Sequence, residues 1–187
     1  MNRRTWLQSF LAAVAGGNLG STVHAASGAP PKEVEALQKN WRTLLAEGMR
    51  PPSPADKVKL TNDEWKKRLD RTQFHVLREE GTERAGSSPL DSEKRAGVFA
   101  CAGCDLPVFT SEMKFDSGTG WPSFFTTIPA VFEIKTDHFL IYPRTEYHCT
   151  RCGGHHGHIF NDGPRPTGLR YCNNGVALKF IPKAAKA

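Results

Sequence analysis

The sequence predicts a mainly β domain, with antiparallel strands and small helices packed at its N-terminal side. After residue 97, short runs rich in β-branched and aromatic residues follow one another, separated by Gly, Pro, Asp and Asn. Helical periodicity is confined to residues before 80. Two C-x-x-C pairs, Cys101/Cys104 and Cys149/Cys152, lie within the β-rich part, which indicates a metal-stabilised domain.

The first 25 residues have the form of an export signal. A segment with paired arginines, 2–8, precedes a short apolar run, 10–15, and the small-residue cleavage site Val23-His24-Ala25. The apolar run is too short and too interrupted by glycine to cross a bilayer, so we expect no stable membrane anchor. The paired arginines favour twin-arginine export, and an ordinary Sec signal is the alternative. Both predict a periplasmic protein of a bacterium.

Residues 26–57 are expected to form a linker and an amphipathic helix. From 31 to 46, Val34, Leu37 and Trp41 recur at helical spacing, and three prolines follow at 51–54. The capping-box sequence Thr61 to Glu64 opens a short helix that carries Trp65. A second helical stretch is expected over 74–78, and a loop over 81–93.

Seven strands are expected after that loop. In the last of them, Val176, Leu178 and Phe180 alternate with Ala177 and Lys179, as in a half-buried strand. No internal repeat is present apart from the two C-x-x-C turns. The expected strands are 98–99, 108–109, 131–134, 138–142, 158–160, 169–172 and 176–180.

Four of the five cysteines suit a closed tetrahedral zinc site. Each C-x-x-C turn presents two sulfurs to one point, and two turns supply four soft thiolates. Glycines at 103, 153 and 154 let the backbone curl around the metal. Two disulfides are the main alternative, because an exported protein meets an oxidising compartment. A redox-active C-x-x-C pair is a further alternative.

Cys172 is the cysteine without a partner. A free cysteine is often only a small buried hydrophobe. If 169–173 is extended, however, Arg170, Cys172 and Asn174 lie on one face. A guanidinium there would favour the thiolate, which is the nucleophilic form.

Histidines and a tryptophan could serve Cys172. His155, His156 and His158 follow the second C-x-x-C pair, and His155 and His158 flank a glycine that could aim both imidazoles at one pocket. The alternatives are surplus zinc ligands and solvated loop histidines. Trp121, between Gly120 and Pro122, lies on a constrained loop, as core filler or as the wall of a ligand pocket.

The charge distribution argues against a nucleic-acid partner. The chain of 187 residues has a formal charge of +6, with 25 basic and 19 acidic side chains. Residues 1–59 hold 8 of the basic and 4 of the acidic groups, so residues 60–187 retain 17 and 15, a net charge of +2. A nucleic-acid footprint requires a basic face on the folded domain.

Several motifs together resemble the B-type methionine sulfoxide reductases. The likeness runs from about Leu60 to Pro182 in family order and includes 64–65 and 78–83. Its most specific segments are Gly120-Trp121-Pro122-Ser123-Phe124, Cys152-Gly153-Gly154-His155-His156-Gly157-His158-Ile159-Phe160, Asp162-Gly163-Pro164-Arg165-Pro166-Thr167-Gly168 and Leu169-Arg170-Tyr171-Cys172-Asn173-Asn174.

The resemblance implies two antiparallel sheets with N-terminal helices, a catalytic domain over 58–183, and one structural zinc ion on Cys101, Cys104, Cys149 and Cys152. The implied substrate is the R epimer of methionine sulfoxide, free or in proteins. Cys172 matches the family's nucleophile, which becomes a sulfenic acid, and Trp121 the residue that lines the methyl pocket. The matching polar active-site groups are His155, His158, Arg170 and Asn174; Asp162 matches a motif acid without an assigned role.

One departure from the family pattern concerns the resolving cysteine. Many members carry it directly before the Gly-Trp-Pro-Ser-Phe motif, where this chain has Thr119. We therefore expect a thioredoxin-like, glutaredoxin-like or small-thiol reductant from outside. We also expect the chain to act as a monomer. The alternative functions are a zinc-ribbon module for nucleic acid and a zinc hydrolase. The first leaves Cys172 and Trp121 idle, and a closed four-thiolate shell argues against the second.

Overall fold

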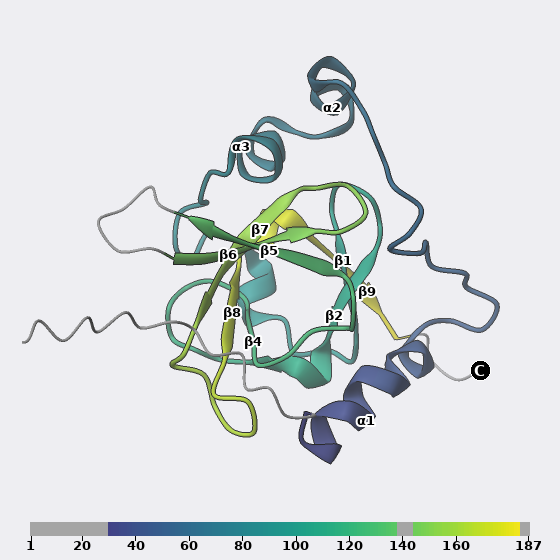
Figure 1. Cartoon of the computed structure of the whole chain (residues 1–187), viewed down its shortest axis with the longest axis vertical. Helices are drawn as coiled ribbons and strands as arrows, with labels where there is room; N and C mark the ends of the chain where they lie inside the picture. The colour runs from purple at the N-terminus through teal and green to yellow at the C-terminus, as the bar shows by residue number, and fades with distance from the viewer. Residues whose placement is uncertain (1–29, 138–143, 184–187) are drawn as a thin grey trace, which may run out of the picture.

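A computed structural model describes residues 30–137 and 144–183. The predicted signal peptide, 1–25, and the strand expected over 138–142 lie outside the described residues. Within them, no helix combines the length and apolar character needed to cross a membrane. Strands make up the centre of the molecule, as predicted (Figure 1).

All strand pairs are antiparallel and belong to two sheets, so the expected fold class is confirmed. The three-stranded sheet has the order β2-β1-β9, and the six-stranded sheet has the order β3-β4-β8-β7-β6-β5. Their bounds are β1 Gly97–Cys101, β2 Pro107–Thr110, β3 Lys114–Phe115, β4 Ser123–Phe124, β5 Phe132–Asp137, β6 Arg144–Cys149, β7 His155–Phe160, β8 Arg170–Asn173 and β9 Leu178–Pro182.

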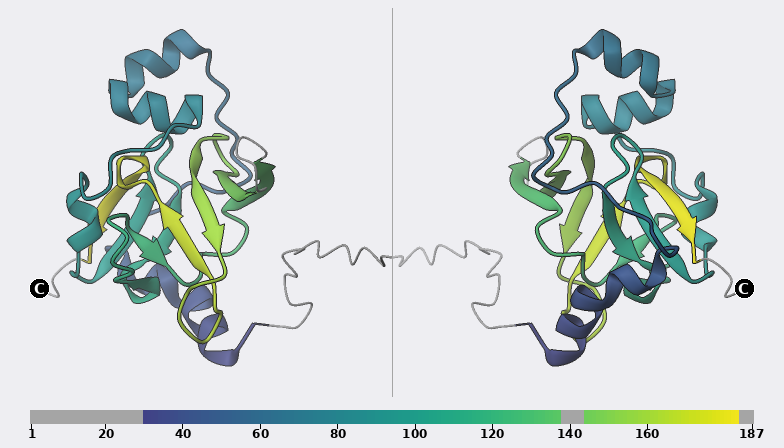
Figure 2. Two further views of the ribbon diagram at one scale, coloured as in Figure 1. Left: turned by 90° about the vertical axis from the view of Figure 1, so that its left-hand side faces the viewer. Right: turned by 90° about the vertical axis from the view of Figure 1, so that its right-hand side faces the viewer.

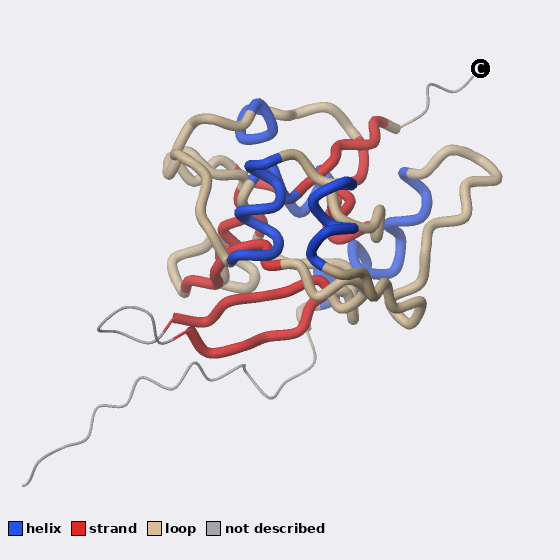
Figure 3. The backbone as a smooth tube through the Cα atoms, turned by 90° about the horizontal axis from the view of Figure 1, so that it is seen from above, coloured by secondary structure: helices blue, strands red, loops and turns tan. Residues whose placement is uncertain are grey.

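The α-helices lie at opposite ends of the strands. Helices α2 (Asn62–Arg68) and α3 (Arg71–Glu79) lie together at one end and α1 (Lys32–Asn40) at the other (Figure 2). Seen from above, α2 and α3 lie over the strands (Figure 3). Short 3-10 turns complete the fold: η1 Trp41–Leu44, η2 Pro89–Ser92, η3 Ser111–Met113 and η4 Gly175–Ala177.

Both helices of the α2–α3 pair begin at capping boxes. Thr61 accepts from the backbone N–H of Glu64, as predicted, while the Glu64 side chain accepts from the Thr61 N–H. Asp70 and Gln73 form the same reciprocal pair, so α3 begins three residues before the expected 74. Each cap satisfies backbone donors that a helix start leaves free.

A stack of phenylalanines joins the two sheets. The rings of Phe109 and Phe124 are parallel, with centroids 3.9 Å apart, and the edge of Phe99 meets Phe124 at 5.1 Å. Segment 31–44 extends this core, because Trp41 is buried against it and Gln38 donates to Thr126 Oγ1 at 3.0 Å. The segment before the β domain is thus packed onto it.

The last predicted strand begins later than expected. Residues 175–177 form the turn η4, and Ala177 is buried although the alternation placed it outside. The reason is tertiary: the Glu83 carboxylate accepts the N–H groups of Gly175 and Val176, which fixes the turn. Strands β3, β4 and β6 were not predicted, because they lack continuous β-rich runs.

Candidate active site and metal centre

The four paired cysteines form one buried cluster. Their sulfur atoms all lie within 4.8 Å of one another, with 3.7 Å between Cys101 and Cys152 and 3.5 Å between Cys104 and Cys149. Four thiolates at about 2.3 Å from a tetrahedral zinc ion are about 3.8 Å apart. All five cysteines are free. The arrangement therefore suits a bound metal ion, whereas the alternative of two disulfides is not what the structure holds.

Backbone turns and one arginine hold this cluster together. In the second turn, the Gly153 N–H donates to Cys149 O at 2.7 Å, and Gly153 has a φ of 71°, where glycine is favoured. Arg151 Nη1 donates to Cys104 O at 2.6 Å and so links the two turns. The cluster is formed from the ends of β1 and β6, in different sheets, and a metal ion there would join them.

Cys172 lies in β8 between two other strands. Its backbone is paired with Ser123 of β4 on one side and with His158 of β7 on the other. The side chain is partly exposed. Burial raises the pKa of the Cys172 thiol, while the charge of Arg170 and hydrogen bonds from Thr119 and Arg170 favour the thiolate. The predicted influence of Arg170 is present, but burial outweighs it.

Asp162 orients Arg170. Arg170 Nε and Nη2 donate to the two carboxylate oxygens of Asp162, each at 2.8 Å, and the guanidinium carbon is 4.3 Å from the centre of the Phe160 ring. The bidentate pair fixes the plane of the guanidinium, and it lowers the pKa of Asp162. Asp162, for which the sequence indicates no role, therefore positions Arg170.

A β-bulge brings His155 and His158 to one side of β7. Tyr147 pairs with Gly157 but His148 pairs with His155, so β7 contains one extra residue. Residues three apart in a regular strand face opposite sides, and the extra residue restores a common face. The two rings are 5.3 Å apart. A Cβ atom on Gly157 would clash with the Cys172 carbonyl oxygen, so glycine permits this close approach.

The three histidines are buried strand residues, so the alternative of solvated loop histidines is wrong. His156 points into a polar core: its Nδ1 is 3.1 Å from Asn173 Oδ1, to which the Tyr147 hydroxyl also donates at 3.0 Å. Burial lowers the pKa of His156 to about 4, so this imidazole is neutral near pH 7. His156 is therefore a hydrogen-bonded residue of the core, and its role differs from that expected of His155 and His158.

Glu146 lies between two of the buried imidazoles. Its Oε1 is 2.6 Å from His148 Nε2, and its Oε2 is 3.4 Å from His155 Nδ1. Nitrogen and oxygen ligands at about 2.0–2.1 Å from one tetrahedral zinc ion are about 3.4 Å apart, so the 2.6 Å contact fits a hydrogen bond better than a shared ion. Sequence reasoning missed Glu146 and His148. Their only signal in the sequence is that they alternate with Tyr147 and Cys149, as residues on one face of a strand do.

The loop containing Glu83 holds Trp121 and the residues after Cys172. Trp121 is half-buried, and its Nε1 donates to Glu83 O at 3.2 Å. The buried Glu83 carboxylate accepts from Gly175 N at 2.5 Å and Val176 N at 3.0 Å, and burial raises its pKa. Sequence reasoning assigned no role to this loop, since a single glutamate in a polar loop has no distinctive pattern.

The side-chain amide of Asn174 hydrogen-bonds two backbone groups. Its Oδ1 accepts from Glu83 N at 2.9 Å, and its Nδ2 donates to His156 O at 3.0 Å. The structure therefore brings Cys172, His158 and Arg170 together on adjacent strands, with Trp121 at their edge. Asn174 lies directly behind them and connects the Glu83 loop to β7.

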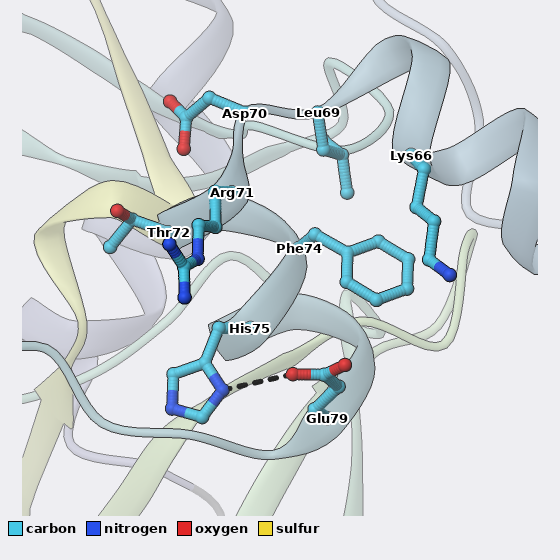
Figure 4. Close-up of a pocket in the computed structure, with 8 residues that line it drawn as sticks. All are labelled: Lys66, Leu69, Asp70, Arg71, Thr72, Phe74, His75 and Glu79. Atoms are coloured by element: carbon cyan, nitrogen blue, oxygen red, sulfur yellow. Dashed lines mark hydrogen bonds and ion pairs between the residues drawn. The ribbon is translucent and has the colours of Figure 1, made fainter.

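A hollow of about 710 Å³ opens elsewhere, between α2 and α3 (Figure 4). Most of its lining residues are charged or polar, and an exposed contact of 3.0 Å joins His75 Nδ1 and Glu79 Oε2. None of the predicted site residues lines it, so the hollow and the Cys172 site are distinct. The lining residues are Lys66, Leu69, Asp70, Arg71, Thr72, Phe74, His75 and Glu79.

A family profile decides the assignment of the chain. The SelR domain profile matches residues 69–182, which include every strand and all of the predicted site residues. This chain belongs to the SelR family. The resemblance drawn from the motifs is therefore confirmed at the level of the family.

Named relatives of the SelR chain come from bacteria, archaea and plants. A peptide methionine sulfoxide reductase MsrB of Pseudomonas putida (strain GB-1) is 49% identical over 130 residues, which cover 68% of this chain and 98% of that protein. An MsrB of Methanosarcina barkeri is 49% identical over 124 residues, covering 66% and 87%. The chloroplastic reductase B1 of Oryza sativa is 47% identical over 128 residues, covering 68% of this chain and 60% of the rice protein.

Proposed function

We propose that this SelR chain reduces the R epimer of methionine sulfoxide, free or in proteins, to methionine. The observation that carries the proposal is the position of Cys172. It is the cysteine outside the four-sulfur cluster, it is partly exposed, and it lies beside Arg170 and His158. The names of the relatives, peptide methionine sulfoxide reductases, support reduction of methionine sulfoxide. A zinc-ribbon module for nucleic acid would leave these groups without a purpose.

The proposed reaction transfers the sulfoxide oxygen to Cys172. The cysteine sulfur attacks the sulfoxide sulfur and forms a transient sulfur–sulfur bond. This bond and the sulfur–oxygen bond of the substrate then break as the oxygen bonds to the cysteine sulfur, which leaves the thioether and Cys172 sulfenic acid. The substrate sulfur gains two electrons, the cysteine sulfur loses two, and the thiol proton ends on the transferred oxygen. His158 and His155 are the groups that hold protons near this oxygen, and Arg170 stabilises the thiolate.

Trp121 and Asn174 have supporting roles in this proposal. The half-buried indole of Trp121, fixed by its hydrogen bond to Glu83 O, offers an aromatic face to the substrate methyl group. Asn174 is proposed as a positioning residue, because its amide holds the backbone of His156 and Glu83. Asp162 acts through Arg170.

We further propose that the four-cysteine cluster holds one zinc ion with a structural task. The sulfur separations suit a tetrahedral thiolate site, and a closed shell leaves no position for substrate. A bound zinc ion would supply a cross-link between β1 and the β6–β7 turn. That cross-link would support β7, which carries His155 and His158.

The reductant is proposed to be an external thiol. Four of five cysteines belong to the cluster, and Thr119 occupies the position before the Gly-Trp-Pro-Ser-Phe motif. Two thiols of a thioredoxin-like or glutaredoxin-like protein, or two small thiols, would convert the sulfenic acid to Cys172 thiol, water and a disulfide. The chain is proposed to act as a monomer, without nucleic acid.

We propose export to the bacterial periplasm and a catalytic domain over 58–183. The signal-like residues 1–25 support export, by the twin-arginine or the Sec route. A zinc protein that is folded before export would enter the oxidising compartment with its cluster thiols already bound.

Separate assays with R and S methyl sulfoxides and a dithiol test the function. Turnover is expected with the R epimer, and Cys172→Ser is expected to abolish methionine formation even in a single turnover. After one turnover without reductant, mass spectrometry is expected to find Cys172 as a sulfenic acid. Activity confined to the S epimer, or methionine formation by the variant, would contradict the proposal.

A further inference from the structure

Three hydroxyl groups form a continuous chain beside Cys172. Thr119 Oγ1 is 2.9 Å from Ser117 Oγ, and Ser117 Oγ is 2.8 Å from Ser123 Oγ. At the far end, Ser123 Oγ donates to the carbonyl oxygen of Trp121 at 3.0 Å. All three separations lie within the range of about 2.5–3.0 Å that is found for O–H···O hydrogen bonds.

The chain lies beside Cys172. Its buried member Ser123 is the strand partner of Cys172 in the β4–β8 pair, and Thr119, at its other end, is among the groups that favour the Cys172 thiolate. The hydroxyl groups therefore connect Cys172 to the backbone of Trp121. The sequence did not indicate the hydrogen bonds within this chain, because serine and threonine in a glycine-rich loop are ordinary turn residues.

Counting protons fixes the direction of the hydrogen bonds. Each hydroxyl has one hydrogen to donate. Since Ser123 donates to the Trp121 carbonyl, Ser117 must donate to Ser123. Thr119 must then donate to Ser117. In this arrangement Thr119 offers only a lone pair to Cys172, which suits the thiol form.

A Cys172 thiolate requires the opposite orientation at Thr119. The thiolate can only accept, so the Thr119 hydroxyl must turn its hydrogen from Ser117 to the sulfur. Ser117 then competes with Cys172 for one proton donor. The hydrogen bond to the thiolate is charge-assisted and therefore stronger than the one that Ser117 receives.

We propose that Ser117, Ser123 and Thr119 form a positioning network that sets the reactivity of Cys172, with Thr119 as donor to the thiolate and Ser117 as its competitor. The benefit to catalysis rests on the proposed role of Cys172 as nucleophile. Arg170, Asp162, Tyr147 and His158 also face Cys172, and the substitutions below leave them in place.

Alkylation of Cys172 by iodoacetamide tests the network without a sulfoxide. The full chain is loaded with zinc, the pH is fixed near 7.5, and the labelled peptide is identified by mass spectrometry. Thr119→Val removes the donor with little change in shape and is expected to slow alkylation about three- to tenfold, the loss of one charge-assisted hydrogen bond relative to a neutral one. Thr119→Ser is expected to recover most of this loss.

Ser117→Ala is expected to change the alkylation rate of Cys172 in the opposite direction. It removes the competitor, frees the Thr119 hydroxyl for the thiolate, and is expected to raise the alkylation rate about two- to fivefold. Thr127→Val is the matched control, since the Thr127 hydroxyl donates to Ile128 O and lies outside the network. Circular dichroism and zinc content verify that each variant is folded.

If Thr119→Val and Ser117→Ala change the alkylation rate in the same direction, the network is overturned, because a general loss of packing around Cys172 would change both rates in one direction. Unchanged rates in both variants would also overturn it. The two proposals fail separately: opposite signs in alkylation without Cys172-dependent sulfoxide reduction refute only the function. Sulfoxide reduction with unchanged alkylation rates refutes only the network.

Discussion

Replacement of Glu83 tests whether one buried carboxylate holds the loop behind Cys172. Glu83 is 6% exposed, and it accepts from Gly175 N at 2.5 Å and Val176 N at 3.0 Å. Glu83→Ala leaves both N–H donors without this partner. The buried Gly175 donor loses its partner at a cost of about 1–3 kcal/mol, and the partly buried Val176 donor costs less, so the variant is expected to lose about 1–4 kcal/mol of unfolding free energy.

Hydrogen exchange locates this loss. The amides of Gly175 and Val176 are expected to exchange at least about 10 times faster in Glu83→Ala, since about 1.4 kcal/mol corresponds to a factor of ten. The Phe99 amide, in the central strand of the smaller sheet, serves as the reference for global opening. Glu112→Gln, at a glutamate outside the buried core, is the control for loss of charge. Unchanged protection at both amides would refute the reasoning.

The same carboxylate predicts a pH dependence. Burial raises the pKa of Glu83 in the folded state above its ordinary value of 4.5, so the folded protein binds this proton more tightly than the unfolded chain. The resulting stability is present below pH 4.5 and is lost as the pH rises through the folded-state pKa. We expect the difference in unfolding free energy between wild type and Glu83→Gln to decrease over that interval in urea titrations. A difference that grows with pH would contradict the assigned direction.

Three further predictions concern the site and the cluster. Gly157→Ala is expected to lose about 1–3 kcal/mol in denaturant unfolding, because its Cβ must displace the Cys172 carbonyl; wild-type stability would contradict the bulge geometry. Thr119→Cys is expected to form a disulfide with Cys172 that peptide mapping detects, whereas Ser87→Cys, at an exposed position, is not; an unpaired thiol at position 119 would place the two side chains apart. Removal of zinc by a chelator is expected to lower the melting temperature, and zinc to restore it; an unchanged melting curve would exclude a structural metal.

Much of the site was predictable because its signals are local. Cys172 was identified as the cysteine left over from two C-x-x-C pairs, and the pairs themselves lie in one cluster as predicted. Their spacing is a property of consecutive residues, so no tertiary information is needed. The N-terminal helices were likewise predictable from capping and apolar periodicity, although α3 begins earlier because its Asp70–Gln73 cap was missed.

The missed residues act over long distances in sequence. Glu83 is 92 positions from Gly175, whose N–H it accepts, and nothing near either residue indicates the other. The Glu146 contact to His155 depends on the β6–β7 pairing and its bulge. Strand β4 has only two residues, and it is defined by pairing with β8 and not by its own composition.

The sequence by itself determined the family, the mainly β class, the four cluster cysteines and Cys172 as the cysteine apart from them, because motif spacing and residue chemistry are encoded in short segments. The tertiary structure decided which groups favour the thiol form of Cys172 and which favour its thiolate. Burial, the Asp162-oriented Arg170 and the hydroxyl chain from Thr119 to Trp121 act on the sulfur together. Their balance depends on which groups adjacent strands bring within hydrogen-bonding distance.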